Sequence, residues 1–371
     1  MNPKSVLLID SSRTELLKKH LLQYYEYNEV NKPSLKDVLF AFLKISSILT
    51  LVRSFFIFKN IRSAFVYTHF YNAIQIYRPK VVIGFYIVMK RKYFFYLANE
   101  FNDIEFIGIA PSRLDSMDKL INISPSRAKF FVHGYSDFNE LAIKGYDESL
   151  IFPNGSFYSH VHSKKIESKC LKYDICILSQ YLHHFDEKEM TPDRKIQLKI
   201  FNLMMDYVSR FSKENPQLKI AIAMRPQERG QIGSDLEKKY FQEKLRNINP
   251  VFINSNELEG SSYKAAINSK IILTHYSTLA YELLGFKKKV LFFQPYEFKY
   301  APIPSRIKWK VMRPKYKVFQ SQLNDLLNIK YSLYEESIKK DAKYFNNMKN
   351  NLIETIKLII DQRITHEKDS E

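Results

Sequence analysis

Short apolar runs alternate with amphipathic stretches along most of the chain. In its first part, runs rich in β-branched and aromatic residues predict strands at residues 5–9, 80–84, 105–109 and 129–132. The segments between these runs carry apolar residues at helical spacing, as in residues 136–143. Strands that alternate with helices in this way are typical of a doubly wound sheet of parallel strands.

A second series of the same kind begins after residue 172. It predicts strands at residues 174–178, 218–224, 251–253, 270–274 and 290–293, and helices at residues 193–213, 234–245, 261–268 and 278–284. The length of 371 residues is also too great for one comfortable hydrophobic core. The predicted fold class is therefore α/β, with two Rossmann-like, doubly wound lobes.

The ends of the two series predict the domain boundaries. Residues 1–155 form the N-terminal lobe, and the polar, aperiodic residues 156–172 form a linker. Residues 173–330 form the C-terminal lobe. Residues 331–371 hold a last helix, expected over residues 331–364, and a polar tail.

The most lipophilic stretch, residues 38–58, does not have the composition of a membrane span. Lys44 and Arg53 interrupt it, whereas a spanning helix needs about 20 apolar residues with few or no charges. We expect a buried or interfacial helix there. No secretory signal is visible, and the two cysteines, Cys170 and Cys176, suggest no disulfide framework. We therefore expect a cytoplasmic protein in which Cys176 is a buried, reduced thiol.

The chain has a formal charge of +18, from 57 Lys and Arg against 39 Asp and Glu. Such a surplus attracts polyanions, including phosphorylated substrates and anionic lipid headgroups. The cations are dispersed, so one interpretation is simply a solvated surface. The other is peripheral attraction to the inner face of a membrane, where a lipid-linked glycan acceptor would lie. No pattern of a nucleic-acid-binding module is present, and we expect no nucleic-acid partner.

The densest chemical signal lies where a buried strand of the second series runs directly into a helix. Ser277 or Thr278 stands at the start of this helix, where free backbone N–H groups and the helix dipole favour a phosphate. Glu282 follows one turn later, in position to accept hydrogen bonds from ribose hydroxyls. His275 precedes the pair and joins these candidate donor-binding residues. The alternative is an ordinary helix whose Ser or Thr satisfies its own backbone donors.

Two other strand ends of the second lobe carry polar side chains. Arg225 ends one strand, and Ser179 and Gln180 follow another. Open α/β sheets bind ligands at the carboxyl ends of their strands, and a guanidinium holds a phosphate or carboxylate with paired donors. The alternative for Arg225 is an exposed turn residue. His183 and His184 lack a carboxylate at coordinating spacing, so we expect no metal site.

Two loops of the first lobe are candidates for the acceptor side. Asp10 and Ser11 follow the first strand, and Arg113 and Asp115 follow the third. In a doubly wound sheet both loops lie at the ligand-binding edge, so Asp10 or Asp115 is a candidate general base for an acceptor hydroxyl. Ser11 and Arg113 are candidate acceptor contacts. The alternative for each aspartate is a role in a turn or a helix cap.

Motifs of several other enzyme classes are absent from the sequence. It has no phosphate-binding P-loop, GxGxxG fingerprint, GxSxG elbow or HExxH helix, which counts against kinases, dehydrogenases, hydrolases and zinc proteases. Six other segments follow one another in an order and at a spacing that match a known family. They are residues 79–83, 106–109, 129–137, 151–156, 173–180 and 277–282. Their order and spacing resemble bacterial GT-B-fold transferases of surface and capsular polysaccharide biosynthesis. More distantly, they resemble CDP-glycerol glycerophosphotransferases and capsular Kdo transferases.

This resemblance implies a nucleotide-sugar donor on the C-terminal lobe, a glycan acceptor on the N-terminal lobe and a last helix that returns to the first lobe. It implies metal-independent transfer, with the donor phosphate at Ser277 and Thr278 and the nucleotide at Glu282. An inverting glycosyltransferase is the first hypothesis. A GT-B-fold UDP-sugar epimerase and a non-catalytic scaffold of a polysaccharide assembly complex are the alternatives.

The chain departs from the family pattern in two places. Residues 110–113 stand where many relatives have a Gln-containing, glycine-ended turn. This departure puts the family's acceptor, and its activity, in question for this chain. Arg225 and Pro226 stand where relatives often have His-Pro. An arginine there would suit a more acidic donor, such as a CMP-activated ulosonic acid, in place of a UDP-sugar.

Overall fold

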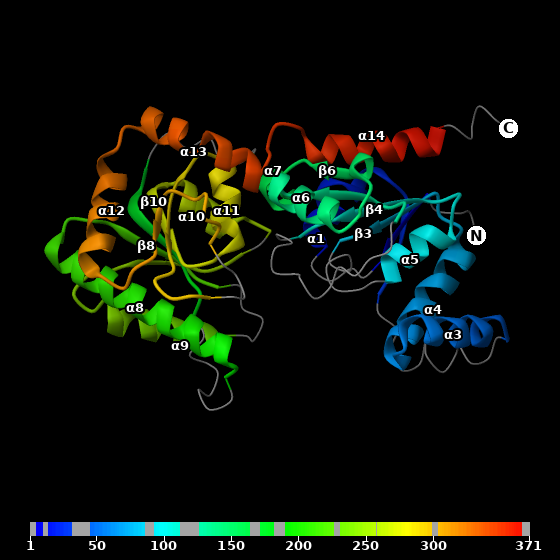
Figure 1. The fold of residues 1–371 in the computed structure, drawn as a ribbon, viewed down its shortest axis with the longest axis horizontal. Coiled ribbons are helices and arrows are strands. Elements are labelled where there is room, and N and C mark those ends of the chain that lie inside the picture. The colour runs from blue at the N-terminus through cyan, green and yellow to red at the C-terminus, as the bar shows by residue number, and fades with distance from the viewer. Residues whose placement is uncertain are drawn as a thin grey trace. The chain divides into compact units, whose positions relative to one another are not determined.

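Each predicted α/β series forms its own six-stranded parallel sheet in the computed structural model (Figure 1). The structure describes residues 5–9, 14–31, 45–85, 93–111, 126–163, 171–181, 190–225, 231–256, 258–298 and 303–365. The chain divides into two compact units. The first comprises Met1–Val161 and Asn347–Glu371, and the second comprises His162–Asn346. The predicted class, α/β with two doubly wound lobes, is confirmed.

The sheet of the first unit has the strand order β2-β1-β3-β4-β5-β6, and every neighbouring pair is parallel. Its strands are β1 (Val6–Ile9), β2 (Tyr27–Val30), β3 (Val81–Gly84), β4 (Glu105–Ile109), β5 (Lys129–Val132) and β6 (Ile151–Pro153). Successive side chains of a strand point to opposite faces. Leu7 and Ile9 therefore enter one core, and Val6 and Leu8 enter another. A strand buried on both faces must be apolar throughout, which explains the continuous apolar run of β1.

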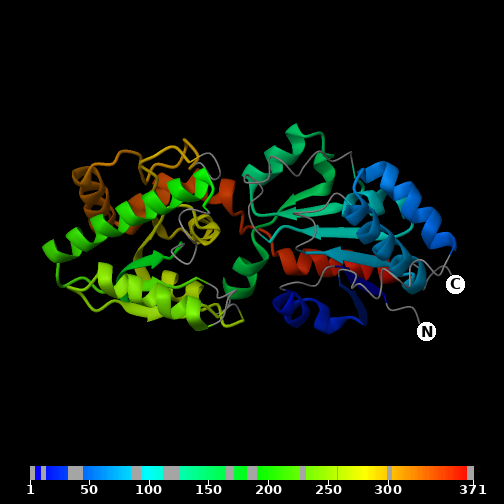
Figure 2. The same cartoon turned by 90° about the horizontal axis from the view of Figure 1, so that it is seen from below.

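Helices cover both faces of this sheet. One core includes residues of α4 (Ile61–Tyr77), α5 (Tyr93–Glu100) and α6 (Tyr135–Ile143). The other includes residues of α1 (Glu15–His20), α7 (Phe157–Ser163) and α14 (Leu352–Thr365). Short 3-10 turns lie at Leu22–Tyr24 and Glu148–Leu150. Figure 2 shows α14, in red, running along this sheet, so the end of the chain completes the first unit.

The sheet of the second unit has the order β12-β11-β10-β7-β8-β9, again with parallel neighbours throughout. Its strands are β7 (Tyr173–Leu178), β8 (Ile220–Ala223), β9 (Val251–Ile253), β10 (Ser269–Thr274), β11 (Lys289–Phe293) and β12 (Lys310–Val311). Its helices are α8 (Pro192–Glu214), α9 (Gln231–Lys244), α10 (Ser261–Ile267), α11 (Thr278–Gly285), α12 (Tyr316–Asn328) and α13 (Tyr331–Phe345).

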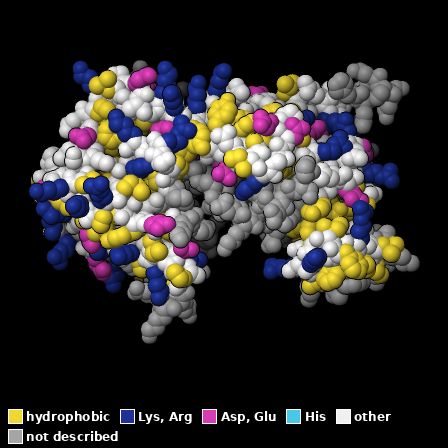
Figure 3. Space-filling model, in the orientation of Figure 1, with side chains coloured by type: hydrophobic (Ala, Val, Ile, Leu, Met, Phe, Trp, Pro, Cys, Tyr) yellow, Lys and Arg dark blue, Asp and Glu magenta, His cyan; other side chains and the backbone are white. Residues whose placement is uncertain are grey.

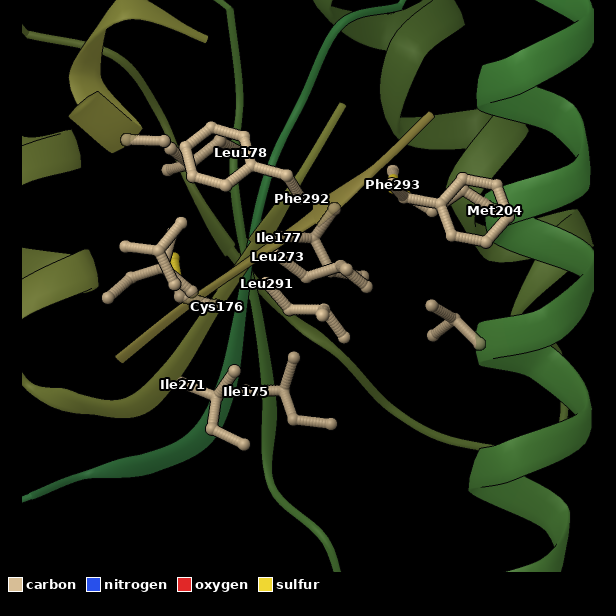
Figure 4. Packing of buried hydrophobic residues seen from close by; sticks show 14 of the residues in the cluster. Ile175, Cys176, Ile177, Leu178, Met204, Ile271, Leu273, Leu291, Phe292 and Phe293 are labelled. Atoms are coloured by element: carbon tan, nitrogen blue, oxygen red, sulfur yellow. The ribbon is translucent and has the colours of Figure 1, made fainter. Parts of the chain in front are cut away.

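One hydrophobic core runs through the second unit. Figure 4 shows part of it, in which β7, β10 and β11 contribute side chains on both faces and Met204 belongs to α8. Cys176 lies in this core and is fully buried, as predicted. Burial raises the pKa of its thiol to about 12, so the thiol stays protonated and acts as a small apolar side chain.

Two stretches differ from the sequence prediction. Part of the predicted linker is the helix α7, where Phe157 and Val161 are buried one turn apart and His160 hydrogen-bonds the carbonyl of Asn154 at 2.6 Å. The single helix expected over residues 331–364 is two helices, α13 and α14. Residues 346–351 separate them, and Asn346 and Asn347 each use the side-chain amide to hold a backbone carbonyl within their own unit. Local apolar spacing could not reveal these distant partners.

Three short strands at sheet edges, β2, β6 and β12, were not predicted. Only Val30 is buried in β2, and β6 ends in a proline, so neither carries a clear alternating pattern. The lipophilic stretch expected as a buried or interfacial helix contains α3 (Ile45–Phe58), while residues 38–44 lie outside the described ones. Within the described ranges, every helix is too short or too polar to cross a membrane.

Candidate functional site

Several of the predicted donor-binding residues come together at one edge of the second sheet. β7 lies between β10 and β8, and Ile177 is in register with Leu273. From β7 the chain continues to β8 and β9 on one side, and then crosses back to β10, β11 and β12 on the other. The loops after β7 and β10 therefore leave the sheet in opposite directions. An open α/β sheet binds its ligand in the crevice at such a switch point.

The start of α11 lies at this switch point. Ser277 is the N-cap residue, with extended backbone angles, but its side chain makes no capping hydrogen bond. Its own N–H donates to Thr274 Oγ1 at 3.3 Å, and its carbonyl accepts from Ala280. The Ser277 and Thr278 side chains are half-buried. The structure thus departs from the ordinary capped helix, and within the described part of the chain no hydroxyl caps the positive end of α11.

Glu282 lies one turn into α11 and is almost fully buried. Its backbone carbonyl accepts a hydrogen bond from Asn346 Nδ2 at 2.8 Å. Gly285, at the end of the helix, lies so close to Asn346 that an added Cβ would come within 2.7 Å of the Asn346 backbone oxygen. These contacts anchor α11 against the end of α13. A carboxylate this deep can meet a ligand only at the floor of a site.

Arg225 follows β8 and has a partner that the sequence did not suggest, Glu237 of α9. Arg225 donates from its backbone N–H to Glu237 Oε1 at 3.2 Å and from Nη1 to the Tyr181 carbonyl at 3.0 Å. The carboxyl of Glu237 also hydrogen-bonds the Ser179 side chain. The strand ends of β7 and β8 are thereby joined through one acidic side chain.

The environment of Glu237 raises the pKa of its carboxyl. Burial is the largest cause, and it outweighs the hydrogen bonds from Ser179 and Arg225 and the nearby guanidinium charge, which act in the opposite direction. One sequence signal could have located this residue. Glu237 stands four residues before Phe241 and eight before Leu245, both fully buried, so it occupies the inward face of α9.

His275 is fully buried directly after β10. Its ring lies 4.4 Å from the Tyr276 ring and 5.9 Å from the Phe201 ring, centroid to centroid. Among the described residues, neither of its ring nitrogens has a hydrogen-bond partner. Burial, with a smaller effect from Arg225, lowers the pKa of His275 to about 3, so the imidazole is neutral. A buried polar group without a partner is uncommon and points to a ligand, a water or a functional role.

Gln180 and the neighbouring polar side chains complete this edge. Gln180 is half-buried directly after Ser179. The Tyr276 hydroxyl accepts a hydrogen bond from Gln197 of α8, which is itself buried. The arrangement therefore combines a neutral histidine and an uncapped helix start after β10 with a guanidinium after β8, on either side of the end of β7. It can accept a phosphate or a carboxylate.

The acceptor-side candidates Asp10, Ser11, Arg113 and Asp115 lie outside the described residues, as do His183 and His184. The described residues at the ends of β4 and β5 make further polar contacts at this edge of the first sheet.

His133, after β5, donates from its backbone N–H to Asp137 at 3.2 Å, and its Nε2 contacts the Ala110 carbonyl at 3.3 Å. It is fully buried and joins the ends of β4 and β5, as expected of a structural histidine.

Comparisons with known proteins place this geometry in context. Residues 137–309 match a family model described as "putative O-antigen biosynthesis protein". A search of curated proteins gives no significant match.

Solved structures with a similar fold cover nearly the whole chain. UDP-GlcNAc 2-epimerase from Neisseria meningitidis bound to UDP-GlcNAc is 13% identical, with 96% of this chain and 99% of that chain covered and a TM-score of 0.57. UDP-GlcNAc 2-epimerase from Methanocaldococcus jannaschii is 13% identical, with 95% and 99% covered and a TM-score of 0.53. The wall teichoic acid polymerase TagF is 12% identical, with 99% and 90% covered and a TM-score of 0.50.

Identities this low show a shared fold and leave the reaction open. The chain is thus a protein of the two-lobed GT-B architecture whose residues 137–309 match a family of O-antigen biosynthesis proteins.

Proposed function

We propose that this chain is a glycosyltransferase that moves a sugar from a nucleotide-sugar donor to a surface glycan. The uncapped start of α11 after β10, at the same edge of the second sheet as Arg225 after β8, carries this proposal. It lies in the part of the chain that matches the O-antigen family. Two of the solved structures with this fold are named for enzymes of UDP-GlcNAc, which supports a nucleotide-sugar ligand.

In the proposed donor site, the phosphate lies at the hydroxyls of Ser277 and Thr278 and at the N–H groups of the first turn of α11. Arg225 holds a second anionic group, either another phosphate or the carboxylate of an acidic sugar. Ser179, Gln180 and His275 line the same edge, and Glu282 forms its floor near the nucleotide. The site is preorganised, because Glu237 and the Tyr181 carbonyl hold Arg225 in place before any ligand arrives.

The proposed reaction is a single, inverting displacement. Asp115 or Asp10 takes the proton of an acceptor hydroxyl, whose oxygen then bonds to the anomeric carbon. The bond from that carbon to the donor phosphate oxygen breaks, and its electron pair leaves with the nucleotide. The helix dipole and the Arg225 charge stabilise this leaving group, so we propose that no metal ion takes part.

The donor half is tested by thermal-shift measurements with CMP, CDP, UDP and GDP, each with and without EDTA. A nucleotide at about 100 times its dissociation constant should add roughly 2.7 kcal/mol to the free energy of unfolding. For a unit of this size, that corresponds to a rise in melting temperature of about 5–10 °C. A protein that no nucleotide stabilises does not have this donor site. A shift that EDTA removes contradicts the metal-independent proposal.

Acceptor residues are tested separately by transfer to a lipid-linked or free glycan. Asp10→Asn and Asp115→Asn should each retain the nucleotide-induced thermal shift, and the variant of the true base should lose transfer. Full transfer activity in both variants rules out the assignment of the base to these two residues.

A UDP-sugar epimerase is the second candidate, because two of the similar solved structures are epimerases. Incubation with UDP-GlcNAc and no acceptor separates the two functions. An epimerase yields the 2-epimer of the sugar, whereas a transferase leaves the donor unchanged until an acceptor is added. Nucleotide binding with neither reaction would instead favour the scaffold hypothesis.

A further inference from the structure

The outward side of α3 in the first unit is apolar. Leu49, Val52 and Phe56 recur at helical spacing and are 66%, 50% and 74% exposed, respectively. The neighbouring side chains that are also exposed are Ile48, Phe55, Ile57 and Ile61. Figure 3 shows hydrophobic side chains gathered over this part of the first unit. Single exposed apolar residues are normal on proteins, but a contiguous group on one helix marks a binding surface.

The inward side of the same helix carries buried polar groups. Ser54 Oγ donates to the Leu51 carbonyl at 2.9 Å and lies 3.3 Å from Thr68 Oγ1 of α4. Ser47 Oγ accepts a hydrogen bond from Asn72 Nδ2 of α4 at 2.9 Å. A helix on the surface of a water-soluble domain normally has its apolar stripe on the inward side only. In α3, Leu51 and Phe58 face inward, but a second apolar stripe faces outward, which means that this outward side is adapted to a surface other than water.

Charge identifies the kind of surface. Residues 38–99, which include α3 and α4, contain no Asp or Glu. Lys59 and Arg62 are exposed in and after the turn that directly follows α3. Arg53 is also exposed and pairs with Glu100 of α5 at 2.7 Å. The apolar side chains are therefore accompanied by cations without nearby acidic neighbours in sequence.

We propose that this side of α3 docks on the surface of an anionic lipid bilayer. Leu49, Val52 and Phe56 would enter the boundary between headgroups and acyl chains, while Lys59 and Arg62 meet lipid phosphates. The 14 residues of α3 are fewer than the roughly 20 that a span requires, which fits a helix lying in the interface. Docking of a second copy is disfavoured, because a two-fold contact through this side would bring like charges together. This inference is independent of the proposed donor site.

The test is flotation of the full-length protein with phosphatidylcholine vesicles, with and without phosphatidylglycerol. The wild type should float with the anionic vesicles and much less with the neutral ones. The triple variant Leu49→Gln, Val52→Gln, Phe56→Gln should lower the partition coefficient at least about tenfold, because it removes the side chains that enter the bilayer. Arg62→Gln should weaken binding to anionic vesicles about fivefold and change binding to neutral ones little.

Ile143→Gln provides the matched control, since Ile143 is 82% exposed on α6 of the same unit. This variant should bind vesicles as well as the wild type. All the replaced side chains are exposed, so melting temperatures should stay unchanged. Should the triple variant fail to fold, the effect of Arg62→Gln and the salt dependence of wild-type binding decide the question.

Two results overturn the proposal. One is a wild type that does not float with anionic vesicles, and the other is a triple variant that floats as well as the wild type. Light scattering adds a third measurement. If the wild type does not bind vesicles but forms a dimer that the triple variant loses, this side of α3 is an interface between two copies.

Discussion

Replacing Ser277 by alanine distinguishes between two roles of its hydroxyl, which are ligand binding and helix capping. A capping Ser or Thr contributes about 1 kcal/mol, with a range of roughly 0.5–2, through its side-chain hydrogen bond to the first helical turn. In the structure, the Ser277 side chain makes no such bond. Ser277→Ala should therefore leave the free energy of unfolding of the free protein nearly unchanged.

The effect should appear when nucleotide is present. A hydrogen bond to a charged group contributes about 1.5–3 kcal/mol, so losing the contact from the Ser277 hydroxyl to phosphate should raise the dissociation constant about 10- to 150-fold. Isothermal titration calorimetry with the nucleotide that gives the largest thermal shift measures this change directly.

Thr191→Ala is the matched control in the same unit. Thr191 is the N-cap residue of α8, and its side chain accepts a hydrogen bond from the Arg194 N–H. This variant should lose about 1 kcal/mol of stability and keep its nucleotide affinity. The opposite outcome, in which Ser277→Ala destabilises the free protein and leaves affinity unchanged, would refute the reasoning. Ser277 would then be an ordinary helix cap.

Three further predictions concern buried groups of the second unit. Because the pKa of Glu237 is raised in the folded state, the native protein binds more protons than the unfolded chain just above the ordinary Glu pKa, and stability should fall as pH rises through that window. Urea unfolding at several pH values should show a smaller fall in the free energy of unfolding for Glu237→Gln than for the wild type. An equal fall in the two proteins would assign the pH dependence to other groups. Because the pKa of His275 is lowered to about 3, lowering the pH from 7 to 5 should cost about 2 kcal/mol through this group alone. His275→Leu should lose that acid sensitivity without losing stability at pH 7, and a large loss at pH 7 would show that the ring has a partner. Gly285→Ala should destabilise the unit by about 1–3 kcal/mol, because the new Cβ meets the Asn346 backbone; unchanged denaturant unfolding would mean that α13 shifts freely.

Much of the second unit could be predicted from local pattern. The strand β9 and the start of α11 fall where the apolar runs and turn signals place them. Burial of Cys176 followed from its position inside an apolar strand. Such features depend on neighbours within a few residues, so periodicity and helix-start chemistry are enough to find them.

Features that depend on distant partners escaped prediction. The end of α13 is decided by Asn346, whose amide meets the Glu282 carbonyl 64 residues away in sequence. Glu237 was missed because its role requires Ser179 and Arg225, which arrive from two other strands. Carboxylates on helices are common in sequences. Only the apolar residues at helical spacing from Glu237, Phe241 and Leu245, could have distinguished it from the others.

The sequence by itself determined the two α/β series and the candidate residues at strand ends, because alternation of apolar and polar positions records which sides of each element meet a core. It also carried the resemblance to surface-polysaccharide transferases. Only the tertiary structure decided which strand ends are neighbours, that the start of α11 lacks a side-chain cap, and that α3 presents its apolar side outward. These properties depend on strand order and on burial, which arise from contacts between segments far apart in the chain.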